Sequence, residues 1–519
     1  MVKEYTTDVL VIGSGGAGLR AAIEAEARGA DVIIVSKSPT GMKTASVVTN
    51  GWFRAAVGGV TEEEHYKATM AGGKDINDTA LVKVMVDEGR DRIMELEKYG
   101  MALQTHNGMV SCGDDPKSRG LGFIMPMVNY LKGKGVKLVE NCIITKLLKV
   151  DGKVVGAVGL QEELVVFKAK AVVLAAGGSG GLYTRTDVPL SMTGDGYALA
   201  YEAGAVLRDM EFVQFLPVGL AEPGQPLIPV YGPVVEEGRI INIDGEDLVE
   251  KHNITARPLA TMSRDLLSRA LMREVEAGKG VDGAALIDAT EVIKEHGMDL
   301  FRNQGHRNVM EAVKVAERPI KVAPLCHFVM AGVRMTPDGE TNVPGLYVAG
   351  EVAGGVHGSN RIGGNAMTDI IVFGARAGAA ATSYAGEASI VDASADQEIK
   401  RIQAKSGESE TEDYHGKLRE LMWTHVGVVR SGEKLKEALN MLTVLGEEAD
   451  SAKGADTATV KRLLEAEMAI LASVLTAKAA LAREESRGTH FRLDYPESSD
   501  EWLRPLLIKK TEEGPEVSL

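Results

Sequence analysis

The chain has 519 residues, 45% of them hydrophobic and 25% charged, which is typical of a globular protein with roughly three or four domains. Its formal net charge of −15 argues against broad binding to nucleic acid or to anionic membranes. No stretch reaches about 18 uninterrupted apolar residues, so we expect no direct insertion into a membrane.

The cysteine content argues against two kinds of metal centre. Cys112, Cys142 and Cys326 are too few and too scattered for a cysteine-ligated cluster or a structural zinc site, so no metal site is predicted. We expect reduced core thiols in a cytoplasmic protein that reaches a membrane only through a partner. The N-terminus leads directly into a predicted strand, without a basic and then apolar leader.

The N-terminal segment predicts a βαβ unit. Residues 8–12 are a short apolar run that ends at glycine, residues 19–28 are an alanine-rich helical stretch, and residues 31–35 are a second buried strand. Residues 61–100 predict two helices, because an acidic start is followed by apolar residues three and four positions apart.

Later segments predict a second domain and a helical region. The predicted strands are 136–148, 153–158 (after a turn at Asp151-Gly152), 171–176 and 343–350. Residues 221–320 combine proline-rich loops with amphipathic helices and predict an inserted domain. We expect a small-residue helix over 369–380, helices throughout 410–485, and an irregular polar tail from residue 488.

A glycine motif lies between the first strand and the first helix. Gly13-Ser14-Gly15-Gly16-Ala17-Gly18 matches G-x-G-x-x-G in the context that supports dinucleotide binding. Gly13 allows a tight turn, Gly15 lets the backbone approach a pyrophosphate, and Gly18 allows close helix packing. The N-terminus of the helix then faces the phosphates.

The rest of the pattern favours FAD over NAD. An acidic residue is expected about 20 residues after the glycines to bind ribose. This chain has Ser36-Lys37 instead, although Ser36 can still bind a ribose hydroxyl. Small residues at 175–178 are typical of passage beside an adenosine, Glu351 stands where ribityl hydroxyls bond, and residues 360–366 offer backbone donors to a flavin ring.

With these motifs, residues 193–196, the glycine-rich block 345–378 and the run 484–490, the chain resembles the succinate dehydrogenase/fumarate reductase flavoprotein family over nearly its full length. An unrelated flavoprotein such as a disulfide reductase would need a redox cysteine pair, which this sequence lacks. The resemblance implies an α/β fold with a Rossmann-type FAD-binding domain (1–220 and 321–395), an inserted α+β capping domain (221–320), a C-terminal helical domain (396–487) and a C-terminal tail (488–519).

The candidate cofactor-binding residues combine the motifs with positions implied by the resemblance. They are Gly13, Gly15, Gly16, Ala17, Gly18, Ser36, Lys37, Thr44, Ala45, Gly51, Ala176, Gly177, Asp195, Glu351, Asn365 and Ala366. In many respiratory members a histidine at the position of Thr44 carries the flavin covalently. The resemblance therefore implies a non-covalent FAD, with a lower potential that suits reduction of a substrate better than oxidation of succinate.

The resemblance also implies the reaction. Family chemistry is hydride transfer between a flavin and a C=C bond beside a carboxylate, with an arginine as the proton donor. Arg361 and His327 match the residues that hold the carboxylate, and Arg264 matches the proton donor. A guanidinium binds a carboxylate through two hydrogen bonds, which agrees with Arg361. An arginine normally stays protonated, so the role of Arg264 rests on the resemblance. His357 is expected to contact the flavin or the far side of the site.

The other half of the expected substrate site departs from the family. Members that bind fumarate hold its second carboxylate with a histidine and a Thr-Glu pair. In an ungapped alignment Leu216, Val230 and Tyr231 stand there, and Val234 replaces an arginine of the proton relay. Because an apolar wall leaves a buried carboxylate uncompensated, we expect an alkyl, aryl or thioester-like distal substituent, with the Tyr231 hydroxyl available for one hydrogen bond.

Three functions remain open at this point. The first is reduction of an α,β-unsaturated carboxylate other than fumarate. The second is a fumarate reductase or succinate dehydrogenase flavoprotein subunit whose distal carboxylate is held by residues such as His106, Arg185 or Arg239. The third is a flavin electron-transfer subunit without a substrate of its own. The joint presence of a carboxylate-binding pair and a proton donor argues against the third.

The expected partners are a small unsaturated or saturated carboxylate and a source of electrons. The sequence contains no CxxCH motif for haem attachment and no set of iron–sulfur cysteines. By resemblance, residues 410–485 contact an iron–sulfur subunit in respiratory members. A partner protein, a diffusible reduced carrier and direct reduction by a nicotinamide remain alternatives.

Overall fold

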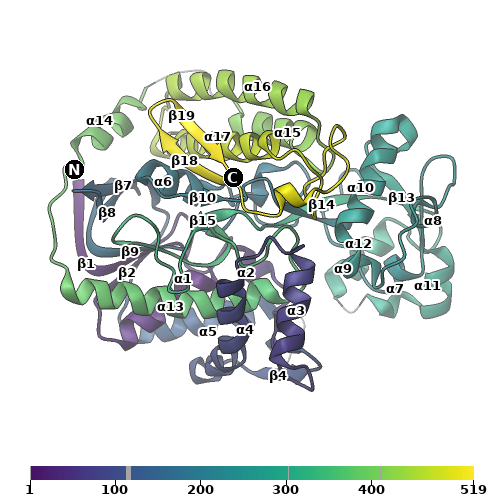
Figure 1. Cartoon of the computed structure of the whole chain (residues 1–519), viewed down its shortest axis with the longest axis horizontal. Coiled ribbons are helices and arrows are strands. Elements are labelled where there is room, and N and C mark those ends of the chain that lie inside the picture. Colours follow the sequence, from purple (N-terminus) through teal and green to yellow (C-terminus); the bar gives the residue numbers. More distant parts are fainter. Residues whose placement is uncertain (1, 113–118, 302, 408–411) are drawn as a thin grey trace.

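A large mixed β-sheet organises the N-terminal part of the protein (Figure 1). The computed structural model describes residues 2–112, 119–301, 303–407 and 412–519. The central strands are parallel, because β1 pairs with β2 and β9, β2 with β6, and β9 with β16, whereas β7 and β8 extend the sheet in antiparallel pairs. The strands are β1 (Val2–Ile12), β2 (Val32–Val35), β6 (Lys137–Val139), β7 (Ile143–Val150), β8 (Lys153–Leu160), β9 (Leu164–Leu174) and β16 (Leu346–Val348).

Local sequence signals account for much of this sheet. Helix α1 (Gly16–Ala27) connects β1 to β2, which confirms the predicted βαβ unit. Asp151 and Gly152, with φ of 49° and 78°, form the two-residue turn between β7 and β8. Positive φ at both central residues is characteristic of the tight hairpin turn that Asp-Gly favours.

Small residues allow a long helix to pack closely on the sheet layer. Helix α13 (Asn365–Glu387) contacts α1, and a Cβ on Gly378 would lie 2.3 Å from the Ala21 carbonyl oxygen. The predicted small-residue helix is therefore confirmed and extends further than expected. The other helices of this region are α2 (Ala45–Val48), α3 (Glu62–Gly72), α4 (Thr79–Met94), α5 (Arg119–Gly133) and α6 (Asp195–Ala203). A small sheet, β3 (Trp52–Arg54), β4 (Leu103–His106) and β5 (Met109–Cys112), lies beside them.

A second lobe, at the right of Figure 1, is formed mainly by residues 221–320. Its sheet has the order β11-β14-β13-β12, and it has its own apolar core. Strand β11 (Val213–Leu220) leads from the first domain into the cap, and β14 (Ile320–Val329) leads back. The two strands pair with each other, so their backbone hydrogen bonds hold the two ends of the cap together. The remaining elements are β12 (Arg239–Ile241), β13 (Ala285–Asp288), α7 (Pro233–Glu236), α8 (Leu248–Lys251), α9 (Leu259–Met262), α10 (Arg264–Glu274), α11 (Thr290–His296) and α12 (Gln304–Ala312).

The C-terminal region is helical, but its tail is not irregular. The helices are α14 (Asp396–Ala404), α15 (Tyr414–His425), α16 (Gly432–Ser451) and α17 (Thr457–Ala482). The tail instead forms the hairpin β18 (Leu507–Thr511) and β19 (Gly514–Ser518), and β18 pairs with β10 (Leu207–Arg208) in a sheet with β15 (Gly332–Arg334) and β17 (Ala353–Gly354). The hairpin was missed because its largely exposed strands carry few apolar residues, of which Ile508 is fully buried.

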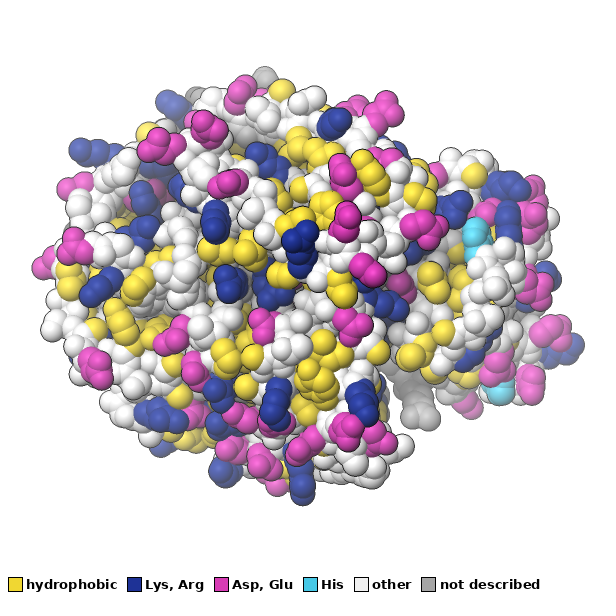
Figure 2. Space-filling model, in the orientation of Figure 1, with side chains coloured by type: hydrophobic (Ala, Val, Ile, Leu, Met, Phe, Trp, Pro, Cys, Tyr) yellow, Lys and Arg dark blue, Asp and Glu magenta, His cyan; other side chains and the backbone are white. Residues whose placement is uncertain are grey.

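The surface agrees with the composition. Figure 2 shows acidic and basic side chains mixed over the visible face, without a large area of one sign. Within the described part of the chain, no helix combines the length and the apolar character needed to cross a membrane.

Gly18→Ala tests the close contact between α1 and the turn before it. A Cβ there would lie 2.1 Å from the Gly13 carbonyl oxygen, so we expect about 1–3 kcal/mol of destabilisation and a lower midpoint of thermal unfolding. Gly386→Ala is the matched control, because a Cβ at this position in α13 meets nothing within 4 Å. Equal midpoints for the two variants would contradict the prediction.

Candidate functional site

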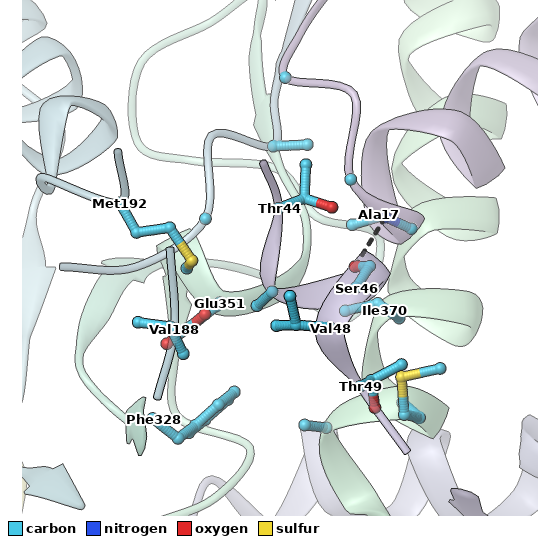
Figure 3. Close-up of a pocket in the computed structure, with 18 of the residues that line it drawn as sticks. Ala17, Thr44, Ser46, Val48, Thr49, Val188, Met192, Phe328, Glu351 and Ile370 are labelled. Atoms are coloured by element: carbon cyan, nitrogen blue, oxygen red, sulfur yellow. Dashed lines mark hydrogen bonds between the residues drawn. The ribbon is translucent and has the colours of Figure 1, made fainter. Parts of the chain in front are cut away.

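A cavity of about 570 Å³ extends from the N-terminus of α1 to the cap. One wall comes from the first domain, where Ala17 and Ser46 lie across the cavity from Val188 and Met192 (Figure 3). The other end is lined by Arg264 from α10, His327 from β14 and Arg361 from the loop before α13. The size is within the usual range for sites that bind small molecules and cofactors.

The glycine motif creates open space at the N-terminus of α1. A Cβ on Gly13 would lie 2.2 Å from the Ala175 carbonyl oxygen, so this residue is needed for close packing. At Gly15, in contrast, the nearest atom would be Ser46 Oγ at 3.5 Å, an ordinary van der Waals contact, and this residue lines the cavity. This open helix N-terminus suits a pyrophosphate, because its amide groups lack helical acceptors. The residues present therefore fit a dinucleotide.

Lys37 connects three parts of the chain at the edge of this cavity. Its Nζ donates hydrogen bonds to Thr193 Oγ1 at 3.0 Å, Asp195 Oδ1 at 2.9 Å and Glu465 Oε1 at 2.8 Å. The Ser36 hydroxyl donates to the Ser38 carbonyl oxygen at 2.7 Å. Both side chains thus make bonds within the protein, and Lys37 fixes the end of β2 against α6 and α17.

Glu351 is a buried acid that lines the cavity. Its Oε1 accepts a hydrogen bond from the Val329 amide at 3.0 Å, and burial raises its pKa to about 7. A carboxyl group poised near neutrality can accept or donate hydrogen bonds to hydroxyls in the cavity.

Most of the predicted cofactor residues line the cavity. These are Gly13, Gly15, Gly16, Ala17, Ser36, Lys37, Thr44, Ala45, Ala176, Gly177, Asp195, Glu351 and Ala366. Three do not: Gly18, Gly51 and Asn365. The Asn365 side chain is committed elsewhere, since its Oδ1 bonds His65 Nε2 and its Nδ2 donates to Thr69 Oγ1, both at 2.9 Å. Gly51 packs against Cys112, where a Cβ would lie 2.6 Å from Sγ.

The predicted catalytic residues converge at the cap end. His327 Nδ1 lies 2.8 Å from Asp187 Oδ2, in the geometry of an N–H donor and a carboxylate acceptor. Burial lowers the pKa of His327, while the charge of Asp187 opposes that shift. A carboxylate behind a histidine fixes the orientation and tautomer of the ring. Asp187 was not identified from the sequence, since it belongs to no motif considered there.

Gln214 joins the two arginines. Its Oε1 accepts from Arg264 Nη1 and from Arg361 Nη2, each at 3.3 Å, and its Nε2 donates to Asn360 Oδ1 at 2.7 Å. The Arg361 guanidinium also lies 4.7 Å from the centre of the Phe328 ring. Burial lowers the pKa of both arginines, and the nearby charge of Arg264 lowers that of Arg361 further. Two buried cations that share one neutral acceptor favour the arrival of an anion.

The expected apolar wall is not part of the cavity. Leu216 is buried in β11, where it pairs with Leu325 of β14, and Val230 is buried in the core of the cap. A register shift between Gln214 and Phe215 breaks the regular alternation of faces along β11, and Leu216 does not line the cavity. Only Tyr231 of the three expected residues lines it.

His357 also lies outside the cavity. Its Nε2 is 3.5 Å from Asp369 Oδ2, and its ring meets the edge of Phe328 with the centres 5.2 Å apart. His357 therefore contacts the Phe328 ring, on which the Arg361 guanidinium also lies, but does not line the cavity.

The other proposed ligands of a distal carboxylate are remote as well. His106 packs on Trp52, Arg185 lies over Trp423, and Arg239 has a side chain that is 63% exposed; none of the three lines the cavity. The structure adds Arg54, Thr261 and His306, which do line it and which no sequence motif marked.

Comparisons with known proteins agree with this arrangement. The family described as "FAD binding domain" matches residues 8–367, and "Fumarate reductase flavoprotein C-term" matches residues 415–519. A chain of "Fumarate reductase (CoM/CoB)" from Methanothermobacter marburgensis is 35% identical, over 98% of this chain and 97% of that protein. "Fumarate reductase flavoprotein subunit" of Mycobacterium tuberculosis is 32% identical, over 98% and 95%.

A solved structure shows the same fold. Sdh1 of Mycobacterium smegmatis, in complex with UQ1, superposes with a TM-score of 0.88 and 32% sequence identity, over 99% of this chain and 93% of that one. The architecture inferred from the sequence is therefore confirmed: a mixed α/β FAD-binding domain followed by a C-terminal domain. The chain belongs to the fumarate reductase and succinate dehydrogenase flavoprotein family, FAD-dependent oxidoreductases that act on CH–CH bonds.

Proposed function

We propose that this enzyme reduces the C=C bond of an α,β-unsaturated carboxylate. The observation that carries the proposal is the convergence of Arg264 and Arg361 on the one oxygen of Gln214, beside the His327–Asp187 pair, in the cavity that begins at the glycine motif. A protein that only carried electrons would need no such cluster of buried cations.

Arg361 and His327 are the proposed carboxylate-binding pair. The guanidinium of Arg361 is held on one side by Gln214 and on its face by Phe328, so its position is fixed before substrate enters. A carboxylate there neutralises the repulsion between the two arginines and accepts charge-assisted hydrogen bonds. The same charges withdraw electrons from the conjugated double bond and polarise it.

Arg264 is the proposed proton donor. It is buried, it donates its Nε to the Ala260 carbonyl oxygen at 3.0 Å, and burial lowers its pKa, which makes release of a proton easier than from an exposed arginine. FAD held at the glycine motif would supply a hydride to one carbon of the double bond, and Arg264 is the group that donates a proton to the other. Burial of the arginine side chains excludes water from this transfer.

The distal substituent is proposed to be something other than a carboxylate. Arg54 is the remaining arginine that lines the cavity among the described residues, and its Nε donates to the Gly363 carbonyl oxygen beside the N-terminus of α13. The charges that act on Tyr231, at the cap end, are those of Asp187, Arg264 and Arg361. A second carboxylate at Tyr231 would therefore have to share Arg264 and Arg361 with the first carboxylate.

The alternative is reduction of fumarate, or oxidation of succinate, by a flavoprotein subunit. The names of two relatives favour it, since both are called fumarate reductase subunits. Those names also support a partner protein that exchanges electrons with this chain, through iron–sulfur clusters or another carrier. In this alternative Arg54 is the candidate cation for the second carboxylate.

Purified protein is expected to release its FAD on acid precipitation. Thr44 lines the cavity where respiratory relatives place the histidine that binds flavin covalently, and threonine cannot form that bond. The supernatant should carry the absorbance of free FAD. A yellow pellet would show a covalent link and contradict the prediction.

Arg264→Ala is expected to keep bound FAD but to lose substrate reduction by at least about 1,000-fold, because the proton donor is gone. Arg273→Ala, an exposed arginine on the same helix, is the matched control and should behave as the unchanged protein. The measurement is reoxidation of chemically reduced flavin under anoxia by crotonate, cinnamate, urocanate and fumarate. Undiminished rates in Arg264→Ala would remove this residue from the mechanism.

A further inference from the structure

The cap contributes three polar side chains to the cavity, each from a different element. Tyr231 lies in the loop before α7, Thr261 in α9 and His306 in α12. None of these elements belongs to the first domain, which supplies His327 and Arg361. The cap side of this end of the cavity thus presents polar groups beside Arg264, and not the apolar wall expected from the sequence.

All three groups are uncharged near neutral pH. Burial raises the pKa of the Tyr231 hydroxyl, so this group keeps its proton. Burial lowers the pKa of His306, so its ring is neutral at pH 7. Thr261 donates its hydroxyl proton to the Pro258 carbonyl oxygen at 3.3 Å and keeps lone pairs free to accept.

His306 has hydrogen-bonding capacity to spare. Its backbone amide donates a hydrogen bond to Asn303 Oδ1, but its ring makes no hydrogen bond with any residue in the described ranges. A neutral imidazole offers one donor and one acceptor. A half-buried ring that faces a ligand cavity with both nitrogens free is suited to binding a ligand.

The charges of the cavity leave room for one carboxylate at this end. Arg264 and Arg361 are both cationic, and Asp187, the nearby anion, is already engaged by His327. The two guanidinium charges and the Asp187 carboxylate sum to one net positive charge (2 − 1), which one substrate carboxylate neutralises, so a second carboxylate would leave this end of the cavity with a net negative charge. An uncompensated charge in a partly buried site is unfavourable, whereas a neutral carbonyl or amide is satisfied by the neutral polar groups of the cap.

We propose that Tyr231, Thr261 and His306 recognise a neutral hydrogen-bonding group, such as an amide or another carbonyl, at the distal end of a monocarboxylate substrate. This inference rests on the proposed function and makes it more specific. It replaces an alkyl or aryl substituent, which would make no hydrogen bond to these three polar groups, and it excludes fumarate as the preferred substrate.

Binding of saturated analogues tests the inference without interference from the reactivity of the double bond. Succinamate carries a distal amide, butyrate a distal methyl group and succinate a distal carboxylate, and all three keep the first carboxylate. They are titrated into the oxidised holoprotein, and binding is followed by the change in flavin absorbance. Succinamate is expected to bind about tenfold more tightly than butyrate, because one or two additional hydrogen bonds contribute about that much affinity. Succinate is expected to bind most weakly.

Two substitutions in the cap test whether its residues cause the preference for succinamate over butyrate. His306→Leu and Thr261→Val should each reduce the ratio of succinamate affinity to butyrate affinity by about threefold to tenfold. His296→Leu is the matched control, because this cap histidine is exposed and lies 3.0 Å from Glu237, outside the cavity. The control should leave the ratio unchanged.

The outcomes separate this inference from the proposed function. Equal or tighter binding of butyrate overturns the inference, as does an unchanged ratio in both cap variants, while reduction of crotonate would still support the proposed function. Tightest binding of succinate, abolished in Arg54→Met, replaces the neutral distal group by a carboxylate. Failure of all three acids to bind, together with failure of crotonate to reoxidise the flavin, overturns both.

Discussion

Two buried guanidinium groups held against one amide oxygen are the constraint on which the rest of the site depends. Gln214 Oε1 lies 3.3 Å from a nitrogen of Arg264 and 3.3 Å from a nitrogen of Arg361. Like charges in a buried site repel, and the shared neutral acceptor relieves this repulsion only in part. Binding of an anion is therefore favourable at the place where the reaction needs a carboxylate.

Maintaining that arrangement requires three distant parts of the chain. Arg264 begins α10 of the cap, Gln214 lies in β11, and Arg361 lies in the loop before α13. The loop is anchored from the C-terminal region, where Thr489 donates both its amide and its hydroxyl to the Ser359 carbonyl oxygen at 3.0 Å. The turn before β11 is secured by a buried ion pair between Glu211 and Arg483, which also pairs with Glu485. The C-terminal region thus supports the site without lining the cavity.

The sequence predicted those features that depend on short-range patterns or on a motif. The βαβ unit, the Asp151-Gly152 turn and the glycine motif were predictable because each requires particular residues at fixed spacing. The positions of Leu216 and His357 were not, because a bulge in β11 and a packed Phe328 ring decide them, and neither leaves a mark in the local sequence. His306 was missed for a similar reason, since α12 reaches the cavity only through the fold of the cap.

This difference changes what Leu216 implies about the substrate. Read along the sequence, Leu216 indicates an apolar wall and hence an apolar substituent. In the fold Leu216 is 1% exposed and pairs with Leu325, so it places no hydrocarbon in the cavity. Beside Arg264, the cap lines the cavity with a hydroxyl, a phenol and a neutral imidazole. Polar groups without charge select for a neutral dipole on the substrate, and hydrophobicity is then a secondary requirement.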